Sequence, residues 1–341
     1  MYPELNTFIF VAALLLALAI DRYWGEPATR WHPVVWMGRY LGWAGRQVAP
    51  LASLQGSPDY KAFRLGAQAW CAGAAIVYIA AWLLQQGLLS LPDVLGPLAG
   101  GVLAALLLGI VLKPMLAWAM LRSEVLAVEA ALGQSLVAGR ERLSWLVSRD
   151  VTNLTEAQVR ESAIETLAEN LNDSVVAPIF WFVLLGLPGA ALYRFANTAD
   201  AMWGYHGVYQ GRNWEWAGKW AARADDVLSW LPARLTALLL ALLCRPQTND
   251  QDGPVAASFM AGLRLEARRT PSPNSGWPMA AMALALGVCL HKPGVYALNA
   301  AGRAPQTADT PRALVYASKV LVALVIIAQA AIIFVVSGGA P

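Results

Sequence analysis

A long stretch without basic residues constrains this fold more than any other feature. Residues 65–112 contain no Lys or Arg, and Asp93 is their only acidic residue. A membrane-spanning helix needs about 20 consecutive apolar residues, so the stretch can hold two. The sequence SLPDVLGP near its middle is typical of a turn. We therefore predict two spanning helices, at 66–88 and 96–118, whose connection lies outside the cytoplasm because it carries no positive charge.

The composition extends this interpretation to the whole chain. Of the 341 residues, 57% are hydrophobic and only 14% are charged, whereas a soluble domain usually has about 25% charged residues. The net charge of +3 is too small to indicate a nucleic-acid partner. Neither the three cysteines nor the three histidines have the spacing of a disulfide or metal framework. We predict an all-α, polytopic integral membrane protein with roughly four to six membrane segments.

The remaining apolar segments are less uniform. Residues 320–337 are uncharged and predict a spanning helix, whereas 5–20, 227–244 and 277–290 are short or contain a charge. Residues 174–193 are interrupted by GLPG. If they cross the membrane, the following basic loop lies outside, against the positive-inside rule. If they instead form a broken or re-entrant element, interrupted at Pro188, the loop stays inside, and we slightly favour this alternative.

We treat the chain as a single membrane domain, 1–341, with four polar loops, of which 21–64 and 119–173 are expected to face the cytoplasm. A linker-like piece, CRPQTNDQDGP, covers 244–254. The polar loops are 21–64, 119–173, 194–226 and 245–276.

A helix that carries a row of carboxylates adjoins the interrupted segment. Thr155 and Gln158 have the spacing of a capping box and predict a helix start. The next carboxylates follow at i, i+4 and i+8, on one face of that helix. A solvated face eased by basic neighbours would explain such a row, but oxygen ligands this dense beside an apolar segment also suit Mg²⁺. The row consists of Glu161, Glu165, Glu169 and, beyond them, Asp173.

Four other polar motifs are candidates for chemistry. Arg149 stands in SRD, and Asn197 and Asp200 stand in NTADAMWGY. His32 lies between Trp31 and Pro33, where it could act in catalysis or have only a structural role in the loop. The sequence AARADDVLSWLPARL places adjacent aspartates between arginines, which predicts a phosphate site or a structural Arg–Asp network. Its charged residues are Arg223, Asp225, Asp226 and Arg234.

The last motif is TPSPNSGWPMAAMA, where a polar loop precedes an apolar helix. Backbone N–H groups and hydroxyls at a helix start can bind an anion, although a simple turn before a helix has the same sequence pattern. The candidate residues are Ser272, Asn274 and Ser275.

Together these motifs resemble a known family. GEPATRWHPVVWMGR, SRDVTNL, AIETLAENLNDSVVAPIF, GLPGAALYRFANTADAMWGY, AARADDVLSWLPARLTA and SPNSGWPMAAMALALGV look like the adenosylcobinamide-phosphate synthases, the CbiB/CobD family of cobalamin biosynthesis. They occur in that family's order from about residue 20 to about residue 297. The chain departs from the pattern at RLEARR, at Leu284 and at HKPGVY, which puts substrate preference in doubt more than activity.

The resemblance implies a multi-pass enzyme of the bacterial inner membrane with a cytoplasmic active site. It would use ATP and Mg²⁺ to join the carboxyl of adenosylcobyric acid, a corrinoid, to aminopropanol phosphate or free aminopropanol. On this interpretation the metal ligands are Glu165, Glu169, Asp173, Asp225 and Asp226, and Asp200, His32 or Glu165 acts in catalysis. Phosphate or substrate would be held by Arg149, Asn197, Arg223, Arg234, Ser272, Asn274 and Ser275.

Two other functions stay open. AmpE-like regulatory membrane proteins are distant relatives, and they would be expected to lack the carboxylate and SPN motifs. A corrinoid-binding or transport protein would also place polar residues among membrane helices. Besides substrates, the expected partner is membrane lipid, and the sequence leaves the oligomeric state open, a homo-oligomer included.

Overall fold

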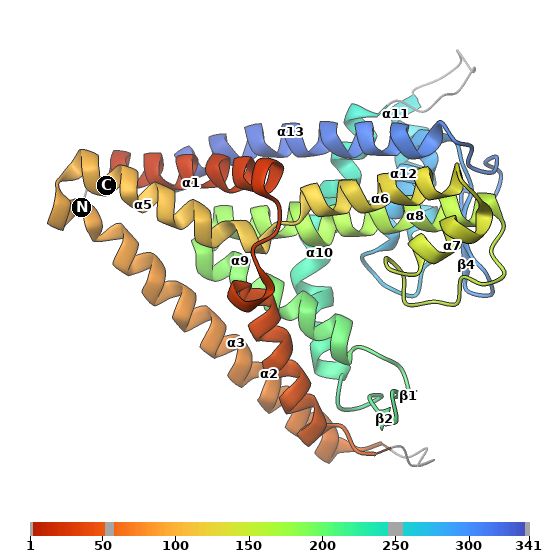
Figure 1. The fold of residues 1–341 in the computed structure, drawn as a ribbon, viewed down its shortest axis with the longest axis horizontal. Coiled ribbons are helices and arrows are strands. Elements are labelled where there is room, and N and C mark those ends of the chain that lie inside the picture. Colours follow the sequence, from red (N-terminus) through yellow and green to blue (C-terminus); the bar gives the residue numbers. More distant parts are fainter. Residues whose placement is uncertain (1–2, 52–57, 245–254, 338–341) are drawn as a thin grey trace. The chain divides into compact units, whose positions relative to one another are not determined.

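The computed structural model describes residues 3–51, 58–244 and 255–337, and almost all of its regular structure is helical (Figure 1). Six helices in this part of the chain are long and apolar enough to cross a membrane. This confirms the predicted polytopic helical membrane protein. The chain forms two compact units, one of residues 1–117, 177–228 and 328–341, the other of residues 118–176 and 229–327. Whether they act as one domain stays a prediction.

The first unit contains the predicted hairpin. Helices α3 (Tyr60–Leu89) and α5 (Pro97–Leu112) are joined by the five-residue helix α4 (Leu91–Leu95). The predicted pair of helices is present, with α3 beginning six residues before 66 and α5 ending at Leu112, six residues before 118, where the Pro114-containing turn Lys113–Met115 follows. α1 (Pro3–Trp24) lies along α5, and α2 (Pro33–Val48) packs against α3 (Figure 1). The unit also holds α9 (Ala177–Trp203), the hairpin β1 (Val208–Tyr209) and β2 (Arg212–Asn213), and the first part of α10 (Lys219–Leu243).

Helix α9 is broken, as the sequence suggested, but the break lies at Gly186 rather than at Pro188. Gly186 has φ 69° and ψ −155°, a backbone conformation that favours glycine. The buried Gln85 of α3 accepts a hydrogen bond from the Leu187 N–H at 2.8 Å. Gly186 thus supplies the backbone conformation of the break, and Gln85 pairs with the N–H of Leu187. Pro188 has no N–H, so it needs no partner at the break. That 174–193 re-enters rather than crosses the membrane stays a prediction.

The second unit is built around a buried helix. α8 (Glu156–Leu171) continues into a π-helical turn, Asn172–Val176, and packs against α6 (Trp118–Leu132), α7 (Leu136–Leu143) and α12 (Gly276–Leu286). The predicted capping box is confirmed: the Thr155 hydroxyl accepts from the Gln158 N–H, and the Thr155 N–H donates to the Gln158 side chain. The unit also contains α11 (Val255–Ala267), β3 (Leu290–Lys292), β4 (Tyr296–Leu298) and most of α13 (Asp309–Ser337). Apart from Cys244, the predicted linker 244–254 lies outside the described residues.

Candidate functional site

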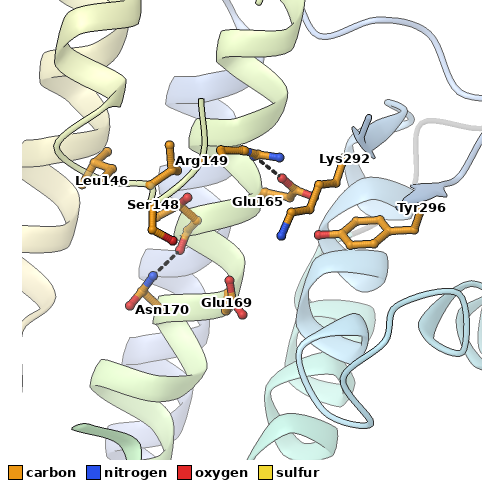
Figure 2. Close-up of a pocket in the computed structure, with 10 residues that line it drawn as sticks. Leu146, Ser148, Arg149, Glu165, Glu169, Asn170, Lys292 and Tyr296 are labelled. Carbon is orange, nitrogen blue, oxygen red and sulfur yellow. Dashed lines mark hydrogen bonds and ion pairs between the residues drawn. The ribbon is translucent and has the colours of Figure 1, made fainter. Parts of the chain in front are cut away.

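Three sequence-predicted residues meet in a pocket of the second unit. The pocket has a volume of about 170 Å³ and is lined by α8, by the loop between α7 and α8, and by the β3–β4 hairpin. Arg149, Glu165 and Glu169 line it together with Lys292 and Tyr296. Figure 2 shows Lys292 and Tyr296 pointing toward the carboxylates of α8. A pocket of this size suits a small ligand or a phosphate group rather than a macrocycle.

The loop that carries Arg149 is fixed from both sides. Val151 and Leu154 belong to a buried apolar cluster with residues of α6, α7 and α8. The Arg140 Nε donates to the Leu154 carbonyl at 2.6 Å, and the Asp150 carboxylate accepts from Thr152. A short polar loop thereby holds its arginine against α8, although SRD alone is too common to predict this.

The Arg149–Glu165 pair leaves hydrogen-bonding groups available. Arg149 Nη2 donates to Glu165 Oε2 at 2.6 Å. The other two atoms of the pair, Arg149 Nη1 and Glu165 Oε1, are buried and have no hydrogen-bond partner among the described residues. Buried polar groups are nearly always hydrogen-bonded, and leaving one unpaired is costly. A buried donor and a buried acceptor beside a small pocket can be satisfied by a water or by a ligand that enters the pocket.

Tyr296 faces the same carboxylates from the hairpin. Burial, then the negative charge of Glu165 and a hydrogen bond with it, and then the charge of Glu169 raise the pKa of its hydroxyl well above the usual value. The hydroxyl therefore stays protonated at neutral pH and can donate a hydrogen bond. With Arg149 and Lys292 it gives the pocket three donor groups opposite two carboxylates.

The rest of the carboxylate row is arranged differently. Glu161 is buried and pairs with His291, accepting hydrogen bonds from its backbone and its ring, so it is turned toward the hairpin. Asp173 lies in the π-helical turn and accepts from the Asn172 amide at 2.8 Å. The row is therefore not a uniformly solvated face.

The candidate anion loop before α12 is closed by its own contacts. Ser272 Oγ accepts from the backbone N–H groups of Asn274 and Ser275, both at 3.2 Å. Arg234 lies between the rings of Trp230 and Trp277, and its guanidinium donates to the Asn274 side chain at 2.8 Å. In this structure these predicted ligands form hydrogen bonds with one another, and their role in binding substrate stays a prediction.

The other predicted site residues belong to the first unit. His32 caps α2 by accepting from the Val34 N–H at 3.3 Å, and its other ring nitrogen lies 3.1 Å from Glu26. Both ring nitrogens are thus already used. Arg223 is exposed on α10. Asn197, Asp200, Asp225 and Asp226 are half-buried on α9 and α10.

Glu26 belongs to a buried ion cluster that the sequence did not reveal. The Lys113 ammonium lies 2.7 Å from Glu26 and 3.3 Å from Asp21, and Lys113 and Asp21 are both almost fully buried. The cluster joins the ends of α1 and α5, which are about 90 residues apart in sequence. Sequence reasoning also missed Lys292, Tyr296 and His291, because HKPGVY reads only as a turn after a short apolar helix.

Metal binding is an expectation that the carboxylates of the pocket fit in part. In the described ranges no group of three or more His, Cys, Asp or Glu side chains is placed to hold a metal ion. Mg²⁺, however, commonly uses only one or two carboxylates together with substrate phosphates and water. Glu165 and Glu169, beside the cations Arg149 and Lys292, provide that kind of donor set.

Comparison with known proteins gives a consistent result. The CobD/Cbib protein family matches residues 14–327. A probable cobalamin biosynthesis protein CobD of Methanothermobacter thermautotrophicus is 40% identical, covering 85% of this chain and 86% of the relative. The cobalamin biosynthesis proteins CobD of Chromobacterium violaceum and Brucella suis are 40% and 36% identical, covering 84% and 90% of this chain and 82% and 92% of the relatives. No solved structure matches the chain.

Proposed function

Because the chain belongs to the CobD/CbiB family of cobalamin biosynthesis proteins, we propose that it is an ATP-dependent amide ligase. It joins the carboxyl of adenosylcobyric acid to aminopropanol phosphate or to free aminopropanol. The observation that carries the proposal is the pocket at Arg149, where a buried donor and a buried acceptor await a ligand beside two carboxylates. We place the protein in the bacterial inner membrane, with this pocket facing the cytoplasm.

The reaction proceeds in two balanced steps. A corrinoid carboxylate oxygen attacks the terminal phosphorus of ATP, giving an acyl phosphate and ADP. The amine nitrogen then attacks the acyl carbon, a C–N bond forms, phosphate leaves and a base takes the proton. An acyl phosphate is needed because a free carboxylate does not react with an amine at neutral pH.

The residues of the pocket hold the phosphate-bearing groups. Arg149 and Lys292 contact phosphate oxygens, with the arginine offering its unpaired Nη1. Glu165 and Glu169 are the expected Mg²⁺ ligands, and bound Mg²⁺ would offset the negative charge on phosphate. Tyr296 stays protonated and donates to the same oxygens. The macrocycle is far larger than the pocket, so only its reacting arm enters.

The test uses the purified protein in nanodiscs with adenosylcobyric acid, Mg²⁺, ATP and either amine. Mass spectrometry should detect the amide, with one ADP formed per amide. Product without ATP, or ADP without product, would contradict the ligase. Corrinoid binding without any product would favour a binding or transport protein, and its absence from folded protein would favour an AmpE-like regulatory role.

A matched substitution tests the metal assignment. Glu165→Gln keeps the size of the side chain and removes its charge, so turnover should fall about 10²–10³-fold. Glu156→Gln lies on the same helix, is exposed, and should leave turnover unchanged. Full turnover in Glu165→Gln and in Asp226→Asn would remove both residues from the set of metal ligands.

A further inference from the structure

The first unit contains an apolar groove that the proposed reaction does not use. It has a volume of about 640 Å³ and is lined by α2, α3, the end of α5 and the part of α9 that follows the Gly186 break. Its lining is aliphatic and aromatic, with Trp31, Trp36 and Tyr40 from the segment between α1 and α3. A cavity of this size and chemistry suits a hydrocarbon ligand.

The length of the groove matches one leaflet of a membrane. On α3 its lining extends from Gly73 to Leu84, and at about 1.5 Å per residue this is roughly 16 Å. The hydrocarbon core of a bilayer is about 30 Å thick, so the groove covers about half of it. Ile76, Ile79 and Leu83 of the same helix are exposed, as expected where a spanning helix faces lipid.

Two arginines stand beside tryptophans of the groove, and neither is itself among the lining residues. Farther along α2, Tyr40 also lines the groove; its hydroxyl donates to the Ala69 carbonyl and its ring adjoins Gly73. Arg39 follows Trp36 by three residues on the exposed side of α2, and the Trp36 indole donates to the Arg30 carbonyl at 3.0 Å. Both arginines are exposed, and neither forms an ion pair within the described ranges.

The side of α2 that carries its glycines is packed against the protein, which leaves the side with Trp36 and Arg39 facing outward. Gly38, Gly42 and Gly45 recur on the inner side, where a side chain would meet Met202, Trp203 or Trp214. This close packing fixes α2 against α9. Tryptophans interleaved with arginines on the outer side are typical of a helix that meets lipid headgroups.

We propose that the groove binds one anionic phospholipid, with an acyl chain between α2, α3 and α5 and its phosphate at Arg30 and Arg39. The charges agree with this orientation: the segment from α1 to the start of α3 is rich in arginine, whereas residues 65–112 contain no Lys or Arg. The segment that carries both arginines therefore faces the cytoplasmic leaflet, which carries the anionic lipids. The site is independent of the ligase reaction.

The test titrates the full-length, detergent-purified protein with dioleoylphosphatidylglycerol or dioleoylphosphatidylcholine and measures binding by native mass spectrometry. With two arginines near its headgroup, the anionic lipid should bind about thirtyfold more tightly than the zwitterionic lipid. Arg30→Gln with Arg39→Gln should abolish this preference while both lipids still bind. Arg64→Gln, also exposed but on α3 away from the groove, should retain the preference.

A second pair of variants tests the acyl chain. Ala80→Phe fills the groove and should weaken both lipids at least fivefold, whereas Ala75→Phe, exposed on another side of α3, should weaken neither. Equal affinity for the two lipids in the wild type would overturn the proposal, as would unchanged binding in Ala80→Phe. A dimer that Ala80→Phe dissociates, without any change in lipid binding, would overturn it in favour of a second copy. If Ala80→Phe does not fold, the arginine variants decide.

Discussion

Each unit holds a cluster of opposite charges near membrane helices, and the two clusters differ in what surrounds them. Lys113 lies between Asp21 and Glu26 at the meeting point of two helix ends. Arg149 also meets a carboxylate, but it lines a pocket into which Lys292 and Tyr296 point (Figure 2). The first cluster joins helices, and the second leaves a donor and an acceptor for a ligand. Similar polar motifs in a sequence can therefore lie in a closed ion cluster in one place and line an open pocket in another.

The largest expected effect lies in the first cluster. Lys113→Met would leave two buried carboxylates without their cation, and breaking a buried ion pair in this way costs about 3–5 kcal/mol. Thermal unfolding in detergent should show a large loss of stability. Lys61→Met, exposed at the start of α3, is the control and should unfold like the wild type. Equal stability of the two variants would show that the cluster does not join the helices.

The break in α9 gives the next effect. Gly186→Ala places a Cβ on a residue with positive φ and against Gln85, which should cost about 1–3 kcal/mol in the free energy of unfolding. Gly87→Ala is the matched control, because a Cβ there meets no atom and α3 is helical. It should be neutral or slightly stabilising. Gly186→Ala with wild-type stability would show that the break adapts to a side chain.

A smaller effect should separate the two amine donors at the pocket. If Lys292 contacts the phosphate of the amine, Lys292→Met should raise the KM for aminopropanol phosphate about tenfold, the equivalent of about 1.4 kcal/mol. The KM for free aminopropanol should not change. An equal rise for both amines would indicate that Lys292 contacts ATP or holds the hairpin instead.

The smallest effect concerns pH. The pKa of Tyr296 is raised in the folded protein above the unfolded value of about 10. Its contribution to stability is therefore fully present below pH 10 and is lost as the pH rises further. Unfolding measured at pH 7 and pH 10.5 should show a larger loss for the wild type than for Tyr296→Phe. Equal losses would mean that the hydroxyl does not lie against the carboxylates.

Sequence reasoning predicted the features that depend on local pattern. The hairpin helices, the capping box at Thr155 and an interruption between 174 and 193 follow from apolar length, cap spacing and GLPG. Several helices are longer than predicted, and α13 begins at Asp309, well before the uncharged part at 320. A helix can continue beyond its apolar part where its charged side chains form ion pairs. Asp309 pairs with Arg303 in this way.

The partners of the polar residues could not be predicted. The carboxylate row suggested one wall of a site, yet Glu161 pairs with His291, about 130 residues away, whereas Glu165 meets Arg149. Lys292 enters the pocket from a hairpin whose sequence indicates only a turn. Such pairings depend on tertiary packing, which no spacing in a single sequence records.

We propose that the pocket at Arg149 carries the reaction, whereas the Lys113 cluster supports the fold. The most direct test is the initial rate of ATP-dependent amide formation per folded molecule in Arg149→Met and in Lys113→Met. Arg149→Met should lower the rate about 10²–10³-fold, because it removes a donor that stabilises charge during the reaction. Lys113→Met should keep the wild-type rate per folded molecule. A normal rate in folded Arg149→Met, or an equally large loss in folded Lys113→Met, would contradict the account.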